Sequence, residues 1–137
     1  AGFAVVACDD RPGTLTPEWV PGVYDRRLVD YKNLGKQCPI GPRDLVVVAT
    51  AGHKSDIDVV IQAMRAKPAY LGCLGSRRKT AFVRARLEQE GFTQEQIDEL
   101  HLPIGVAIEA EDPEEIAISI AAEMIHLRRT KLVPRKR

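Results

Sequence analysis

The chain has 137 residues, which is the length of one ordinary domain, and its 20 basic and 19 acidic side chains leave a formal net charge of +1. Six of the cations lie in the last ten residues, so the rest of the chain carries about −5, which argues against a nucleic-acid-binding surface. No apolar stretch reaches the ~20 residues of a membrane-spanning helix and no signal peptide is recognisable, so the sequence predicts a cytoplasmic protein without a membrane partner.

Short apolar runs alternate with amphipathic segments along the chain, which is typical of a parallel α/β sheet. The runs are nearly continuous in apolar residues, as interior strands covered on both faces are, and they lie at 3–8, 45–50, 69–74 and 104–108. Residues 11–44 contain five of the nine prolines. They are therefore expected to be mostly loop, with one short strand near Val23 or Leu28.

Two helices are predicted between the second and fourth apolar runs. In the first, Ser55 and Asp58 form a variant capping box, and the helix is expected to end near Lys67, before Pro68. The second is expected to run from 76 to about 90 and to stop at the glycine that follows.

Two further helices are predicted toward the C-terminus. Thr93 and Gln96 cap a short one. Asp112 and Pro113 open the last and clearest helix, in which isoleucine, methionine and leucine recur at helical spacing. Its predicted buried face consists of Ile116, Ile120, Met124 and Leu127.

The most informative stretch is LGCLGSRRK at 71–79, where an apolar run breaks at two glycines and restarts as a helix with three consecutive cations. Gly72 and Gly75 are expected to allow positive φ and close approach of a ligand to the backbone, and Ser76 is a good N-cap. Because cations at a helix start oppose the helix dipole, the pattern favours a bound phosphate-like anion. The alternative is a capped strand-to-helix turn with solvated arginines.

Further candidate residues follow the first two strands. Asp9 and Asp10 occupy the place where a Rossmann carboxylate accepts hydrogen bonds from a ribose diol. Alternatively, Asp10 caps the loop or pairs with Arg11. His53 follows the second strand, at the same edge of the sheet, and is either a ligand contact or a hydrogen-bonding loop residue. Cys73 is either a thiolate activated beside a helix N-terminus or a structural thiol.

At this point the motifs resemble a known family. In order and spacing they are similar to the C-terminal Rossmann-like domain of the XdhC/CoxI family, the accessory proteins of xanthine dehydrogenase and carbon monoxide dehydrogenase. The resemblance covers residues 2–129, and it rests on Asp9-Asp10-Arg11, TAGHKSD (50–56), YLGCLGSRRK (70–79), Pro103-Ile104-Gly105 and DPEEIAISIAAEMI (112–125).

The resemblance implies a three-layer, Rossmann-like α/β domain with a mainly parallel sheet over 1–129. A basic tail at 130–137 is expected to be disordered or an expression-vector remnant. The family usually begins with a strand and a Gly-Ala-Gly-His-type turn, and this first βα unit is absent here. We therefore expect a second copy of the chain or a complementary chain to complete the sheet, since the first strand of such a fold is central. Ala51 occupies one of two positions where family members often carry histidine, which leaves His53 alone.

The implied function is maturation of molybdenum hydroxylases. The domain would bind molybdenum cofactor (molybdopterin), or a related phosphorylated pterin or nucleotide, and help its sulfuration or its insertion into a client such as xanthine dehydrogenase. No nucleophile–base pair or metal-ligand cluster is recognisable, so we assign no catalytic or metal-binding residue and expect binding rather than turnover. The predicted cofactor contacts are Gly72, Gly75, Ser76, Arg77 and Arg78 for the phosphate, with Asp9, Asp10 and His53 facing the rest.

Two other functions stay open. One is an NAD(P)-binding oxidoreductase or redox-sensing module. The other is a non-catalytic scaffold that mediates oligomerisation.

Overall fold

The structure of the chain is a computed structural model that describes residues 2–50 and 52–132. Its strands form two parallel pairs. β1 (Val6–Asp9) pairs with β2 (Asp25–Leu28), with Val6 opposite Asp25. β3 (Leu45–Val48) pairs with β4 (Tyr70–Cys73), with Leu45 opposite Tyr70. The short strand expected near Leu28 is thus confirmed as β2.

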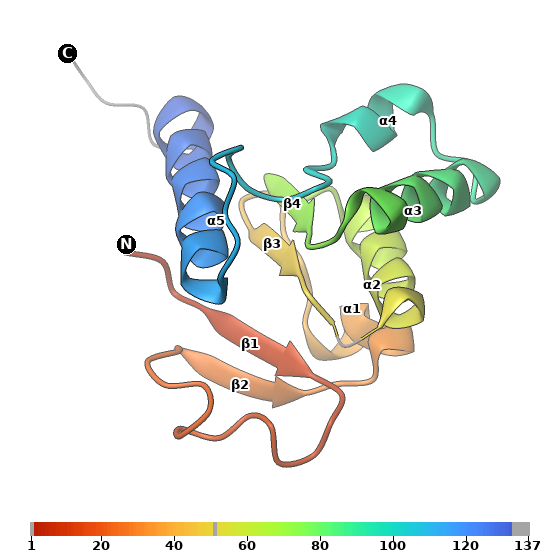
Figure 1. Cartoon of the computed structure of the whole chain (residues 1–137). Coiled ribbons are helices and arrows are strands. Elements are labelled where there is room, and N and C mark those ends of the chain that lie inside the picture. Colours follow the sequence, from red (N-terminus) through yellow and green to blue (C-terminus); the bar gives the residue numbers. More distant parts are fainter. Residues whose placement is uncertain (1, 51, 133–137) are drawn as a thin grey trace.

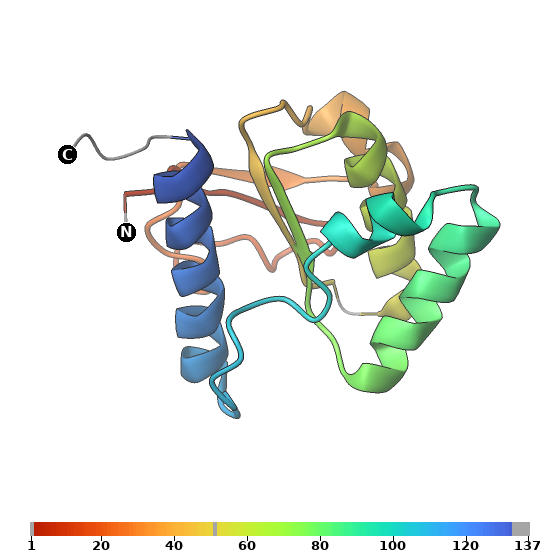
Figure 2. The same cartoon turned by 90° about the horizontal axis from the view of Figure 1, so that it is seen from above.

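Helices cover the strands from both sides and give three layers. Figure 2 shows α5 (Pro113–Leu127) on one side of β3 and β4, with α2 (His53–Ala66) and α3 (Arg77–Gln89) on the other. The predicted three-layer α/β architecture is confirmed. Among the residues that the structure describes, no helix has the length and apolar character needed to cross a bilayer. The shorter elements are η1 (Tyr31–Asn33), α1 (Leu34–Gln37), α4 (Gln94–Glu99) and a π-helical turn η2 (Arg128–Leu132).

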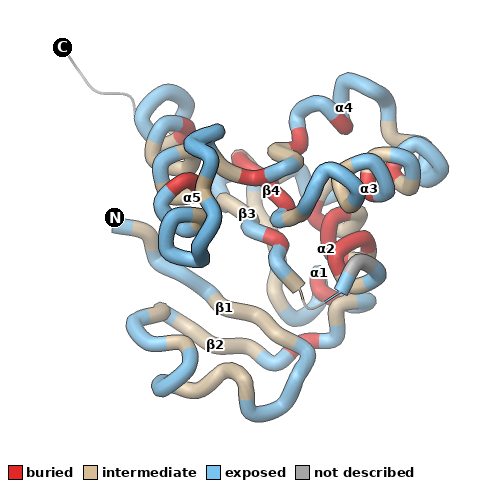
Figure 3. Tube along the Cα trace, in the orientation of Figure 1, coloured by how far each residue is buried: buried red, intermediate tan, exposed pale blue. Residues whose placement is uncertain are grey.

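The sheet is divided, which the sequence pattern did not predict in this form. Within the described residues, β1 pairs only with β2 and β3 only with β4, so no ladder joins the two pairs. All four residues of β4 are buried, as expected of an interior strand, whereas no residue of β1 is buried. The expectation that the run at 3–8 is an interior strand is therefore wrong in this structure. Figure 3 shows the contrast, with buried residues gathered around β4 and α2 and none along β1.

Most predicted helix termini are confirmed by their cap hydrogen bonds. The Ser76 side chain accepts a hydrogen bond from the Lys79 N–H at the start of α3. Thr93 and Asp112 each form a complete capping box with the residue three positions on. These caps depend only on local sequence, which is why residue spacing was enough to find them.

Two local expectations are wrong. Helix α2 begins at His53 with Gly52 as its N-cap, so Ser55 lies inside the first turn and caps nothing. The apolar run at 104–108 forms no strand. Gly105 has a φ of +97°, which turns the backbone away from an extended path, and the Val106 N–H donates to the Ser119 carbonyl of α5 instead.

The main hydrophobic core lies between β3, β4, α2 and α3. Its fully buried members include Val60, Ala63, Val83 and Leu87. A smaller cluster joins β4 to α5 through Tyr70, Ile104 and Leu127. By contrast, the loop between β1 and β2 is open to solvent, and Trp19 within it is 80% exposed.

Gly72 provides a test of this packing. A Cβ at this position would lie 2.5 Å from the Ile104 Cδ1, so we expect Gly72→Ala to lower the free energy of unfolding by about 1–3 kcal/mol through overpacking. Urea denaturation measures the change. Gly35→Ala is the matched control, because a Cβ there meets nothing within 4 Å and lies in helix α1. That substitution should stabilise the chain by up to about 1 kcal/mol. Equal effects of the two substitutions would contradict the packing role of Gly72.

Candidate functional site

The turn from β4 into α3 presents an exposed helix N-terminus with two cations. Ser76 caps the helix, and Arg77 and Arg78 are its first two residues. Both arginines are exposed, and neither forms an ion pair with any residue in the described ranges. The first N–H groups of a helix have no intrahelical acceptor, so this end carries backbone donors as well as side-chain charge. The anion site expected at this turn stays a prediction, for which these residues supply the donors and the charge.

Lys79, the third cation of the triplet, does not belong to this surface. Its ammonium group forms an ion pair with Asp56 of α2, and its side chain is only 11% exposed, while that of Asp56 is fully buried. The other Asp56 oxygen accepts hydrogen bonds from the Thr50 N–H, at 2.9 Å, and from the Thr50 hydroxyl, at 2.6 Å. Asp56 therefore links the loop after β3, helix α2 and the start of α3. Sequence reasoning grouped Lys79 with the arginines, although residues one and two positions apart on a helix do not face the same way.

The two glycines have different roles from those predicted. Neither Gly72 nor Gly75 has a positive φ, so the expectation based on left-handed backbone is wrong. A Cβ on Gly75 would lie 2.6 Å from the Lys79 Cδ. Because Gly75 has no side chain, the Lys79 side chain can extend past it to form its ion pair with Asp56.

The aspartates lie at the end of β1, on the other strand pair. Arg11 donates two hydrogen bonds to the Asp9 carboxylate, from Nε at 3.0 Å and from Nη2 at 2.8 Å. These hydrogen bonds lower the pKa of Asp9 to about 2. The pairing that the sequence offered as an alternative for Asp10 is therefore made by Asp9, and a ribose hydroxyl would have to compete with Arg11 for it. Asp10 is exposed.

The structure brings only part of the predicted site together. Gly75, Ser76 and both arginines form one surface at the start of α3, and Asp9 and Asp10 lie on the separate β1–β2 pair. The backbone of His53 begins α2, beside the Thr50–Asp56–Lys79 cluster, but the His53 side chain lies outside what the structure describes. Figure 1 shows the carboxyl ends of all four strands directed the same way.

Cys73 has the character of a structural thiol. It is fully buried at the end of β4. Burial, together with the nearby Asp56 carboxylate, raises the pKa of Cys73 to about 11, so the thiolate expected beside a helix N-terminus is disfavoured.

A second polar cluster was missed from the sequence. The Tyr70 hydroxyl donates to the Glu123 carboxylate of α5 at 2.5 Å, and the His101 Nδ1 lies 3.1 Å from the same oxygen. The Tyr70 and His101 rings stack with centroids 4.5 Å apart. These residues are far apart in sequence and share no motif, so only the fold relates them. They fix α5 against β4 at the amino end of the strands.

Comparison with known proteins gives one family. The model of the XdhC Rossmann domain matches residues 1–124. The chain is 32% identical over 130 residues to the uncharacterized protein YqeB of Escherichia coli K12, covering 93% of this chain and 23% of that protein. It is 28% identical over 128 residues to a probable subunit of xanthine dehydrogenase from Bacillus subtilis 168, covering 93% of this chain and 37% of that protein.

One further relative and one solved structure are also similar to this chain. The chain is 28% identical over 105 residues to the molybdenum cofactor insertion chaperone PaoD of E. coli K12, covering 77% of this chain and 33% of that protein. A crystal structure described as a xanthine dehydrogenase from Bacillus halodurans superposes with a TM-score of 0.81 at 29% identity, over 98% of this chain and 38% of that one. The chain thus spans well under half the length of each of these proteins.

The Asp56–Lys79 pair should be essential for stability. Lys79→Met leaves a buried carboxylate without its cation, so we expect a loss of about 3–5 kcal/mol in the free energy of unfolding. Arg78→Met, at the neighbouring exposed cation, should change it by less than about 0.5 kcal/mol. Chemical denaturation of the two variants makes the comparison, and similar losses for both would show that Lys79 has no special role.

The Asp9–Arg11 pair should be visible in a titration. NMR of the Asp9 carboxyl carbon is expected to give a pKa of about 2, moving up toward the ordinary value in Arg11→Ala. Because the folded-state pKa is lowered, the stabilisation by this pair is present above the unfolded pKa of about 3.9 and is lost as the pH falls toward 2. An ordinary Asp9 pKa in the unsubstituted chain would mean that the pair does not persist in solution.

Proposed function

Since this chain belongs to the XdhC Rossmann-domain family, we propose that it serves in the maturation of molybdenum hydroxylases. In this role it binds molybdenum cofactor, or a related phosphorylated pterin or nucleotide, as cargo and helps its sulfuration or insertion into the apo-enzyme. The proposed client is a molybdenum hydroxylase such as xanthine dehydrogenase. Two relatives whose names concern xanthine dehydrogenase and molybdenum cofactor insertion support the proposal.

The observation that carries the proposal is the pair of exposed arginines at the capped start of α3. A phosphate needs donors and positive charge in one place, and Arg77 and Arg78 offer both beside the free N–H groups of the first turn. The residues present therefore fit the phosphate end of a pterin cofactor. Gly75 and Ser76 would shape the turn around it, while Gly72 acts through packing.

Asp9, Asp10 and His53 are proposed to face the pterin or nucleotide end of the cargo. Asp9 ends β1, Asp10 follows it, and His53 follows β3, so all three belong to the carboxyl edge, where ligands of open α/β sheets bind. The exposed Asp10 can accept hydrogen bonds directly, whereas Asp9 does so only by releasing Arg11.

Two kinds of protein partner are proposed. One is the client hydroxylase, and the other is a second copy of this chain or a complementary chain that completes the divided sheet. We propose a cytoplasmic location as part of the same function, because the client apo-hydroxylases would be found there.

Removal of both arginines tests the anion site. Arg77→Ala/Arg78→Ala should weaken binding of molybdopterin, measured by calorimetry under anaerobic conditions, by about 2–4 kcal/mol, because two charge-assisted hydrogen-bonding groups are lost. Arg86→Ala is the matched control, since Arg86 lies toward the other end of α3 in a partly exposed ion pair with Glu90. Equal affinity of the double variant and the control would exclude the α3 terminus as the phosphate site.

A second measurement separates delivery from the other functions. The chain should increase the activity of a co-expressed apo-hydroxylase and should not turn over NAD(P)H with alcohols or hydroxy acids, because delivery of a cofactor requires binding without turnover. Steady NADH turnover would favour an oxidoreductase. The absence of both NADH turnover and cofactor binding would favour a scaffold.

A further inference from the structure

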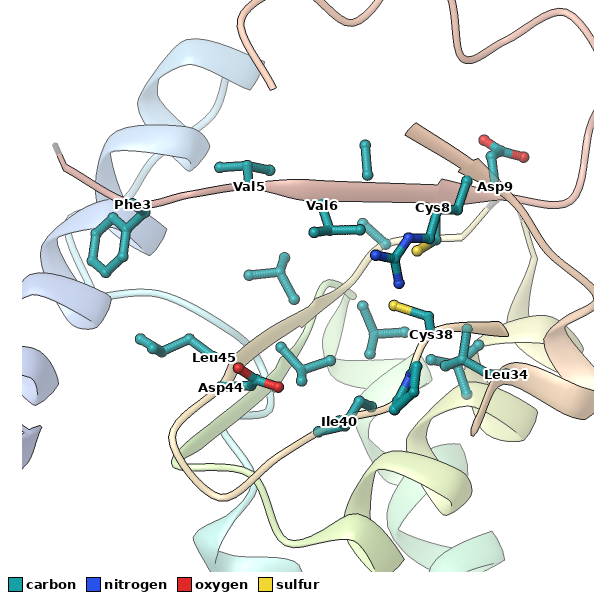
Figure 4. A pocket seen from close by; sticks show the side chains of 18 of the residues that line it. Phe3, Val5, Val6, Cys8, Asp9, Leu34, Cys38, Ile40, Asp44 and Leu45 are labelled. Carbon is teal, nitrogen blue, oxygen red and sulfur yellow. The ribbon is translucent and has the colours of Figure 1, made fainter. Parts of the chain in front are cut away.

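Two of the three cysteines meet in the cleft between the two strand pairs. The cleft has a volume of about 690 Å³, and Cys8 and Cys38 both line it. Figure 4 shows their sulfur atoms directed toward one another, with Cys8 on β1 and Cys38 on the segment that precedes β3. The two thiols form a hydrogen bond. They are far apart in sequence and share no spacing motif, so only the fold relates them.

An arginine connects the surroundings of the two thiols. Arg27 lies opposite Cys8 in the β1–β2 ladder. Its side chain also hydrogen-bonds Cys38, and its Nη1 lies 3.4 Å from the carbonyl oxygen of Gln37, the residue before Cys38. Both cysteines are only half-buried, whereas Cys73 is fully buried. A small reagent that enters the cleft can therefore reach the pair but not the third thiol.

The two thiols differ in how readily they react. Thiol–disulfide exchange requires a thiolate. Burial raises the pKa of Cys8 to about 12, together with the hydrogen bond and the negative charge of a Cys38 thiolate, so Cys8 keeps its proton at neutral pH. Cys38, which lies against the Arg27 cation, is therefore the attacking thiol. Part of the rise in the Cys8 pKa disappears once Cys38 no longer carries a charge.

We propose that Cys8 and Cys38 form a reversible disulfide by exchange with a low-molecular-weight disulfide. The Cys38 thiolate attacks one sulfur of that molecule, forms a mixed disulfide and releases one thiolate. Cys8 then loses its proton and attacks the Cys38 sulfur, which expels the second thiolate. The two cysteines are oxidised by two electrons in total. The small disulfide is reduced to two thiols, which take up the two protons that the cysteines lost.

The disulfide would link parts of the fold that no strand ladder joins within the described residues. It would connect β1, which ends at Asp9, to the residue that follows α1. Helix α1 in turn contacts α2, which belongs to the main core. Oxidation would therefore fix the β1–β2 pair against the body of the domain. The bond needs only residues that the structure describes, and it is independent of which cargo the domain binds.

The position of the pair favours a transient bond over a permanent one. Persistent disulfides are rare in the cytoplasm, the compartment proposed for this chain, and those that form there usually respond to redox conditions. A disulfide in an open cleft is accessible to attack by small thiols. It would therefore be reduced again when the ratio of thiol to disulfide around the protein rises.

Mass spectrometry of the oxidised chain tests the proposal. The reduced chain is incubated with oxidised and reduced glutathione, quenched with acid, unfolded and alkylated at its remaining thiols. We expect Cys8 and Cys38 to be joined in one cross-linked pair of peptides, with Cys73 alkylated as the internal control. At millimolar reduced glutathione the cross-linked form should exceed the glutathione adduct by about tenfold or more, because the second thiol is held beside the first.

A thermal melt measures the consequence for the fold. The cross-link closes a loop of about 30 residues and should raise the melting temperature of the oxidised chain by about 5–15 °C, measured by circular dichroism. Reduction with dithiothreitol should reverse the shift.

Two single variants assign the steps. Cys8→Ser should accumulate a glutathione adduct on Cys38, because the second thiol is missing. Cys38→Ser should react at Cys8 at least about tenfold more slowly than Cys8→Ser reacts at Cys38, because Cys8 keeps its proton. Equal rates in the two variants would contradict the role of Cys38 as the attacking thiol.

Three other outcomes would overturn the proposal. In the first, Cys8 and Cys38 both remain open to alkylation in excess oxidised glutathione. In the second, both carry glutathione without a cross-link. In the third, the cross-link joins two chains, as a non-reducing gel would show, or includes the buried Cys73.

Discussion

The buried carboxylate of Asp56 is the constraint on which the arrangement of the loop after β3, α2 and the start of α3 depends. It is fully buried, accepts two hydrogen bonds from Thr50 and pairs with Lys79. A charge removed from water in this way is stable only when all of its partners are present. The loop after β3 and the start of α3 are therefore held in one fixed relation. As a result, the backbone at Arg77 and Arg78 is held in place, and both residues are exposed at the start of α3.

Local patterns predicted the helices well because caps and apolar spacing act over only a few residues. Ser76, Thr93 and Asp112 begin their helices as expected. Ser55 fails as a cap because the N-cap of α2 lies three residues earlier, at Gly52, which has an extended conformation. The run at 104–108 looks like a strand in sequence, but Gly105 turns the backbone and α5 provides the hydrogen-bond partner. Both errors arise where tertiary contacts override local preference.

The candidate site was predictable in composition but not in arrangement. The two glycines and the cations were recognised together, yet the structure assigns Gly72 to packing against Ile104 and Gly75 to accommodating Lys79. Asp9 was recognised by its place after a strand, while its pairing with Arg11 was given only as an alternative for Asp10. The Tyr70–His101–Glu123 cluster has no sequence signature, since its members are brought together only when α5 packs on β4.

The exposed loop between β1 and β2 has a consequence for spectroscopy. Trp19 is the only tryptophan in the chain and is 80% exposed, far from the core around β4. Its fluorescence should therefore show the emission of a water-exposed indole in the folded chain and change little when the core melts. Intrinsic fluorescence would underestimate the cooperativity of unfolding, whereas circular dichroism of α2, α3 and α5 would follow the core itself.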